Sequence, residues 1–207
     1  MAKLKIYTFP DPVLAQKAAP VTRVEKSMHK LADDMLETMY DAPGIGLAAN
    51  QVGILQRIIV VDTEYDMEDL PEGIDPPQGV EVAGGGIITN KKPIIVINPE
   101  IIYKEGEICI AEGCLSVPEY TAEVKRAEKI KVQYQDVDGV TRTLMTEGLQ
   151  AVCFQHEMDH LEGRLFIDRL SPLKKDMAKK KLLKERKERE AEIQAALQGS
   201  SKGPRRV

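Results

Sequence analysis

Cysteine is scarce in this sequence of 207 residues, and long apolar runs are absent from it. Cys109, Cys114 and Cys153 are an odd number of cysteines without the spacing of a disulfide framework, which indicates a reducing compartment. No apolar run approaches the roughly 18 residues that a membrane-spanning helix needs. Residues 1–12, MAKLKIYTFPDP, show neither a signal peptide nor a transit peptide. These absences predict a cytoplasmic protein without a membrane partner.

The net charge is small but unevenly distributed along the chain. A formal charge of −4 gives no reason to expect DNA or another nucleic acid as a partner of the chain as a whole. Residues 174–207 hold 12 Lys and Arg against 5 Asp and Glu, a charge of +7, so residues 1–173 carry −11. We therefore expect one folded domain over 1–173 and a basic tail over 174–207, helical to about Gly199 and disordered beyond.

The N-terminal part of the domain contains the pattern of an amphipathic helix. Apolar residues, several of them methionines, recur at helical spacing between residues 24 and 39. Thr22 and Glu25 form a candidate capping box, and Pro43 with Gly44 ends the pattern. We interpret the apolar stripe as core and His29, which lies outside it, as a surface residue.

The middle of the chain has the patterns of β-strands. Residues 56–62 (QRIIVVD) and 93–99 (PIIVINP) predict strands. Residues 63–92 between them are acidic and rich in Gly and Pro, which predicts a long surface insertion. Residues 129–145 alternate in polarity around Asp138-Gly139, a pattern that predicts a β-hairpin.

A second helix is predicted over 146–163, with Thr146 as N-cap and Gly163 as C-cap. Five of its residues, at helical offsets 0, 3, 4, 7 and 11, share one face: Leu149, Val152, Cys153, His156 and His160. Because this face is apolar, we expect the two histidines on it to point inward. The fold class is therefore expected to be α+β, with antiparallel strands packed around this central buried helix. An N-terminal amphipathic helix and a C-terminal helix complete it.

His156, Glu157 and His160 form a His-Glu-x-x-His pattern on this helix. Residues i and i+4 lie one turn apart, so the two imidazoles can bind one divalent metal. Glu157 beside them can accept a proton from water and pass it to a leaving amine. The pattern alone leaves open a pair of helix histidines without a metal, although burying them without a partner would cost desolvation.

A catalytic metal of this kind needs a third protein ligand and an open position. Phe166 stands where longer zinc-protease motifs carry a third histidine, and the nearest downstream candidates beyond Asp168 and Asp176 start at Glu185, in the charged tail. A cysteine therefore remains as the third ligand. Cys153 lies on the same helix and would converge poorly with the histidines. Cys114, at a change from strand to turn, is favoured over Cys109 in a strand-like stretch.

Three motifs together resemble the peptide deformylase family. GIGLAANQVG at 44–53, EGCLS at 112–116 and QHEMDHLEG at 155–163 occur in the order of that family's three motifs. The resemblance covers about residues 1–172. It implies an enzyme that removes the N-formyl group from the formyl-methionine of new bacterial polypeptides and releases formate. Two other classes remain as alternatives, a zinc endopeptidase and a protein with a structural or sensor metal site.

The resemblance also implies roles for single residues. Cys114, His156 and His160 would bind the metal, and Glu157 would be the general base and acid. The side chain of Gln51 and the backbone N–H of Leu115 would stabilise the oxyanion. The substrate pocket would be formed by Gly44, Ile45, Gly46, Ile110, Glu112, Gly113, Leu149, Val152 and Cys153. Gly44 and Gly46 would allow close approach of the substrate backbone. A core role stays open for Leu149 and Val152, and we interpret Arg126 as structural.

The cofactor implied by the resemblance is one divalent metal, Fe(II) first, with Zn, Ni or Co also able to occupy the site. The expected partner is an N-formylmethionyl peptide. Some bacterial members use a basic C-terminal helix to dock on the ribosome, and the tail of charge +7 is compatible with phosphate contacts. The alternative for the tail is a solvated charged helix.

Overall fold

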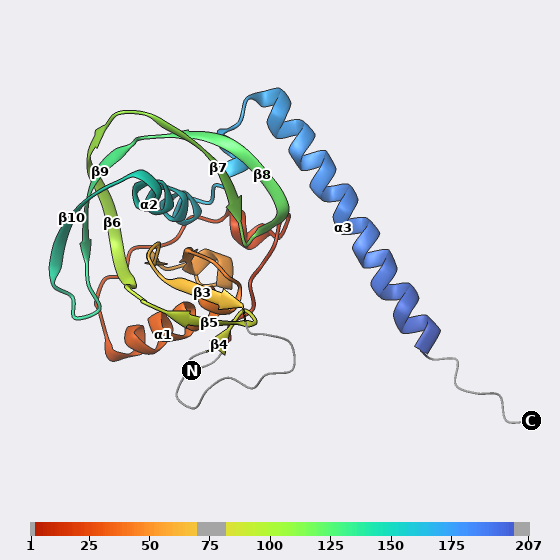
Figure 1. The fold of residues 1–207 in the computed structure, drawn as a ribbon, viewed down its shortest axis with the longest axis horizontal. Helices are drawn as coiled ribbons and strands as arrows, with labels where there is room; N and C mark the ends of the chain where they lie inside the picture. Colours follow the sequence, from red (N-terminus) through yellow and green to blue (C-terminus); the bar gives the residue numbers. More distant parts are fainter. Residues whose placement is uncertain (1–2, 70–81, 201–207) are drawn as a thin grey trace, which may run out of the picture. The chain divides into compact units, whose positions relative to one another are not determined.

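The computed structural model describes residues 3–69 and 82–200, with side chains described as far as residue 194 (Figure 1). The chain divides into two compact units, Met1–Phe166 and Ile167–Val207, and each is described by itself. The expected end of the catalytic domain at residue 173 stays a prediction.

The sheets of the first unit are built from antiparallel strands. Its largest sheet has the order β1-β2-β6-β9-β10, which comprises Gly46–Ala48, Ile58–Val61, Ile94–Glu105, Lys129–Gln135 and Thr141–Glu147. A separate two-stranded sheet pairs β7 (Ile108–Cys114) with β8 (Val117–Arg126). The β9–β10 hairpin predicted around Asp138-Gly139 is present, and Gly139 takes a φ of +77° in its turn. Left-handed backbone of this kind is accessible mainly to glycine.

The central helix is α2 (Gly148–Leu161), which lies inside the curve of the strands (Figure 1). Phe154 and Leu161 are completely buried and pack in one cluster with Ile59 of β2 and with Ile130 and Val132 of β9. Each large apolar side chain buried in this way contributes roughly 1.5–3 kcal/mol. The α+β class with a buried central helix, expected from the sequence, is confirmed.

Helix α1 (Lys26–Asp41) packs on β1 and β2 and forms a second core cluster. Met35 and Met39 are completely buried, which confirms the methionine stripe as core, and His29 is exposed as predicted. The predicted capping box is wrong. The helix begins only after Glu25, which is the N-cap and makes no side-chain capping bond.

The described part of the segment 63–92 is more ordered than a surface insertion. Its described part forms a three-stranded sheet in the order β3 (Asp66–Asp69), β5 (Gly86–Thr89), β4 (Val82–Ala83). Ile88 is buried in the α1 cluster, so the prediction of a purely surface segment is wrong there. Strands this short, next to Gly and Pro, give little periodicity to detect. The rest of the prediction falls on residues 70–81, outside the described residues.

The ends of α2 differ partly from the prediction. Thr146 belongs to β10 and donates its hydroxyl to Gln150 Oε1 at 2.7 Å, so the N-cap is Glu147. Gly163 follows the C-cap with a φ of +70°, which agrees with the glycine expected there. Boundary shifts of one or two residues of this kind arise because a strand leads directly into the helix.

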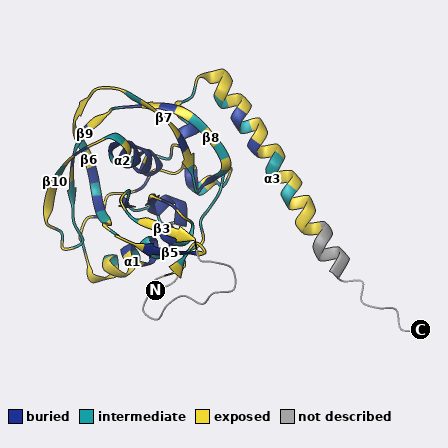
Figure 2. Cartoon of the chain, viewed as in Figure 1, coloured by how far each residue is buried: buried dark blue, intermediate teal, exposed yellow. Residues whose placement is uncertain are grey.

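The second unit consists mainly of α3 (Pro172–Ser200), whose described side chains are mostly exposed (Figure 2). Ion pairs at i,i+4 follow the helix, among them Lys184–Glu188 at 3.7 Å and Arg186–Glu190 at 2.7 Å. The helix extends close to Gly199, as predicted, and the disorder predicted beyond it lies outside the described residues. No helix in the described part of the chain has the length and apolar content to cross a membrane.

Candidate metal centre and substrate pocket

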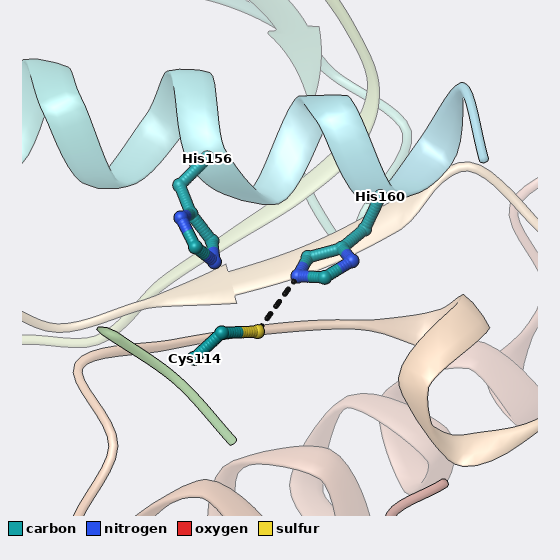
Figure 3. Close-up of side chains that lie close together, drawn as sticks. All are labelled: Cys114, His156 and His160. Carbon is teal, nitrogen blue, oxygen red and sulfur yellow. Dashed lines mark hydrogen bonds between the residues drawn. The ribbon is translucent and has the colours of Figure 1, made fainter. Parts of the chain in front are cut away.

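Two histidines of α2 face the cysteine at the end of β7 (Figure 3). Cys114 Sγ lies 3.3 Å from His160 Nε2, and the candidate ligand atoms of Cys114, His156 and His160 lie within 4.8 Å of one another. Cys109 is exposed on the same strand, and Cys153 is not part of the group. The structure thus brings together the three residues that the sequence favoured.

The donor set fits a divalent metal. A thiolate and two imidazoles are common ligands of Zn and of other first-row metals. His156 turns its Nδ1 toward Glu112 Oε2 at 2.8 Å, which leaves its Nε2 free for an ion, as metal-bound histidines usually do. Within the described residues the group contains three members, so a fourth position is left for water or substrate.

The electrostatics of the two histidines favour a single positive charge. Burial disfavours the imidazolium of His156, yet Cys114 and then Glu112 raise its pKa well above the usual value. Burial, together with the charge on His156, lowers the pKa of His160 well below its usual value. The two pKa values thus move in opposite directions, because a charge on His156 disfavours a second charge on His160.

Arg126 connects this centre to two elements of the fold. Its guanidinium is buried and donates to both carboxylate oxygens of Glu112, at 2.7 and 2.8 Å, and to Asp159 Oδ2 at 2.5 Å. Burial opposes ionisation of Glu112, but Arg126 and His156 lower its pKa to about 2. Glu112, expected only at the substrate, thus also orients His156. The structural role expected for Arg126 agrees with this geometry.

Glu157 is buried beside the candidate metal ligands and lines the pocket. Burial raises the pKa of its carboxyl to about 7, because ionisation in a site poor in water is unfavourable. Its Oε2 has no hydrogen-bond partner among the described residues. A carboxyl with a pKa near neutrality can accept and release a proton with equal ease.

Gly46 leaves room for two of these side chains. A Cβ at this position would lie 2.5 Å from Glu157 Oε1 and 2.7 Å from Cys153 Sγ. A side chain at position 46 would therefore collide with Glu157 and Cys153 even when no substrate is bound. Close approach of the substrate, the reason given from the sequence, is not the only one.

Gln51 is buried in a 3-10 helix, η2 (Ala49–Val52), that follows β1. Its Oε1 accepts a hydrogen bond from Ala48 N at 2.8 Å, and its Nε2 donates to Ser116 Oγ at 3.1 Å. The same Nε2 lies 3.6 Å from Cys114 Sγ. Gln51 is therefore a buried residue whose carboxamide is held on both sides, and not an exposed loop glutamine.

A pocket of about 500 Å³ opens beside these groups, with a mostly apolar lining. All the residues predicted for the substrate pocket line it: Gly44, Ile45, Gly46, Ile110, Glu112, Gly113, Leu149, Val152 and Cys153. Leu149 is nearly half exposed, so it is not a core residue, whereas Val152 is buried. The sequence did not indicate Pro43, Ala111, Pro118 or Glu119, which also line the pocket. Their position next to the motifs was the available signal.

The comparisons with known proteins agree on one family. A family model described as Polypeptide deformylase matches residues 3–176. The peptide deformylase of Syntrophobacter fumaroxidans is 48% identical over 188 residues, which cover 91% of this chain and 98% of that protein. The peptide deformylase of Bartonella tribocorum is 43% identical over 190 residues, with 91% and 96% covered.

Solved structures show the same relation. A peptide deformylase from Legionella pneumophila matches with a TM-score of 0.74 and 40% identity, covering 91% of this chain and 98% of that one. The enzyme from Ehrlichia chaffeensis in complex with actinonin matches with a TM-score of 0.73 and 39% identity, covering 89% and 98%. Sequence, fold and the grouping of the three motifs thus lead to one conclusion: the chain belongs to the peptide deformylase family.

Proposed function

We propose that this chain removes the N-formyl group of formylmethionyl peptides at the centre formed by Cys114, His156 and His160. The observation that carries the proposal is the convergence of these three donors beside a buried Glu157, next to an apolar pocket. In the reaction, water adds to the formyl carbon and the C–N bond breaks. Formate leaves, and the peptide keeps a free amino terminus.

The metal would be held by Cys114, His156 and His160. When bound, such an ion polarises the formyl oxygen and makes water acidic enough to act as a nucleophile near neutral pH. Glu112 fixes the orientation of His156 through Nδ1, and Arg126 holds Glu112 in turn. This support holds the imidazole of His156 in place through Nδ1 and leaves its Nε2 for the metal.

Glu157 is the proton carrier in this proposal. Its carboxylate takes a proton from the attacking water and gives it to the departing nitrogen, which would otherwise leave as an unstable anion. The pKa of about 7 suits both steps, because neither protonation state is strongly preferred at neutral pH. The free Oε2 is available for the transfer.

Gln51 and the backbone N–H of Leu115 are proposed to stabilise the oxyanion that develops on the formyl oxygen. A neutral amide donates a hydrogen bond without competing for the metal, and Nε2 of Gln51 already lies near Cys114. Leu115 follows Cys114 directly and also lines the pocket. Each donor of this kind is typically worth about 3–4 kcal/mol in the transition state.

The apolar pocket is proposed to receive the methionine side chain. Ile45, Ile110, Leu149 and Val152 provide apolar surface around it. Gly46, Glu112 and Gly113 lie at its wall next to the metal ligands, where the main chain of the peptide would pass. A volume of about 500 Å³ accommodates one such side chain with part of the peptide.

The experiment is formate release from formyl-Met-Ala-Ser by protein purified without oxygen, with Glu157→Ala alongside. We expect release by the unmodified chain and near-complete loss in the variant, with the metal still bound. Cleavage of an internal peptide bond would indicate an endopeptidase instead. No release with any metal would favour a structural or sensor metal site.

Fe(II) is proposed as the native metal, with Zn, Ni and Co as substitutes. A thiolate ligand next to Fe(II) makes the site sensitive to oxygen, because Cys114 can be oxidised. The protein loaded with Fe(II) should therefore lose activity in air, and the protein loaded with Ni or Zn should not. Equal stability of all forms in air would contradict this assignment.

The basic tail is proposed to dock on the ribosome through phosphate contacts, which would place the enzyme in the cytoplasm beside its nascent substrates. The support is its charge of +7 and the long exposed helix α3. Deleting residues 174–207 should weaken ribosome binding at low salt and spare activity on short peptides. Unchanged ribosome binding would reject this role.

A further inference from the structure

The orientation of the Gln51 carboxamide is fixed by the chain itself. Ala48 N can only donate a hydrogen bond, so the group 2.8 Å from it must be the oxygen of Gln51. The amide nitrogen therefore lies on the opposite side, toward β7 and the metal ligands. Gln51 is 1% exposed, so water cannot easily replace either contact.

Ser116 contacts that nitrogen from a position outside the pocket. Its Oγ accepts from Gln51 Nε2 at 3.1 Å, and the residue is completely buried. It does not line the pocket, so it has no contact with a substrate there. An amide nitrogen carries two hydrogens about 120° apart. With one engaged by Ser116, the other is directed to Cys114 Sγ, to which Nε2 donates a long hydrogen bond at 3.6 Å.

The main chains of both residues are held by the same N-terminal segment. Tyr7 N donates to the carbonyl oxygen of Gln51 at 2.7 Å, and Phe9 N donates to that of Ser116 at 2.8 Å. The two residues are 65 positions apart in sequence, yet each is bonded to a segment of only three residues. This common attachment holds the main chains of Gln51 and Ser116 next to each other.

We propose that Ser116 is a positioning residue for deformylation, which holds the Gln51 carboxamide with one N–H directed at the place where the formyl oxygen becomes negative. The inference rests on the proposed function. A donor set in place before the reaction stabilises the transition state without the cost of ordering it at that moment. Ser116 therefore acts only through Gln51.

The test is a double-mutant cycle with formate release from formyl-Met-Ala-Ser by the metal-loaded chain. Ser116→Ala should lower kcat by roughly 10- to 100-fold with little change in KM, and Gln51→Ala by roughly 10²- to 10³-fold. The double variant should be no slower than Gln51→Ala alone, because Ser116 has no other route to the reaction. Metal content and melting temperature are measured on all four proteins.

A merely structural role for Ser116 would give a different pattern. The losses in kcat would then multiply in the double variant, and this result, or a normal kcat in Ser116→Ala, overturns the positioning role alone. If Ser116→Ala fails to fold, Ser116→Cys enters the same cycle, since a thiol keeps the volume but accepts hydrogen bonds weakly. Absence of formate release from the unmodified chain would overturn the proposed function as well.

Discussion

All residues of α2 from Ala151 to Glu157 are buried, whereas most described residues of α3 are exposed to solvent (Figure 2). In α2, packing against the strands and a buried ion network determine the position of the helix. In α3, exposed i,i+4 ion pairs support the helix locally. A helix that carries catalytic groups, as proposed for α2, must hold them to fractions of an ångström, which only tertiary packing achieves. A helix that offers charge to a partner, as proposed for α3, has no such requirement.

The largest effect on stability is expected from removing the buried charge that pairs α2 with β8. Arg126→Met should lower the free energy of unfolding by about 3–5 kcal/mol, because Glu112 and Asp159 would stay buried without their cation. Urea unfolding measures it. Lys125→Met, next to it but exposed and paired with Glu107, is the control and should leave the free energy of unfolding almost unchanged. Similar losses in both would contradict the account.

A smaller effect is expected at the end of α2. Gly163→Ala should cost roughly 2–3 kcal/mol, because a φ of +70° strains alanine and its Cβ would lie 2.6 Å from the carbonyl oxygen of Ala15. Gly148→Ala shares a positive φ of +61° but meets open space, so it should cost only about 1 kcal/mol. The melting temperatures of the two variants separate the cost of the contact with Ala15 from the cost of the positive φ. Equal losses would mean that the Ala15 contact is unimportant.

The smallest effect is expected in α3. Arg186→Ala removes an exposed i,i+4 pair with Glu190 and should change the free energy of unfolding by less than about 0.5 kcal/mol. The change should shrink further at high salt, because solvent-exposed charges are screened. A loss above about 2 kcal/mol would show that α3 depends on more than local pairs.

Features of both helices that depend on local spacing and composition could be predicted from the sequence. The helical spacing of His156 and His160, with the glycine after the helix, predicted a buried helix that carries two candidate metal ligands, and both histidines are buried in α2. Favouring Cys114 over Cys109 rested on a turn signal, and the structure places the first with the histidines and the second on the surface. The composition of the tail indicated its exposed helix.

Contacts between distant segments left no comparable signal. Arg126 is 33 positions from Asp159, and Gln51 is 65 positions from Ser116, so neither pairing follows from local periodicity. The sheet within 63–92 was missed because its strands are short and interrupted by glycines. Thr22 and Thr146 were misassigned as caps because the true boundaries depend on neighbouring packing and strands.

Cys114, His156 and His160 are proposed to form the metal centre that carries out deformylation. The most direct test compares Cys114→Ala with Cys109→Ala, a cysteine exposed on the same strand, for bound metal and formate release after anaerobic purification. Cys114→Ala should lose most of its metal and its activity, while Cys109→Ala retains both. Full metal occupancy and normal formate release in Cys114→Ala would contradict the account.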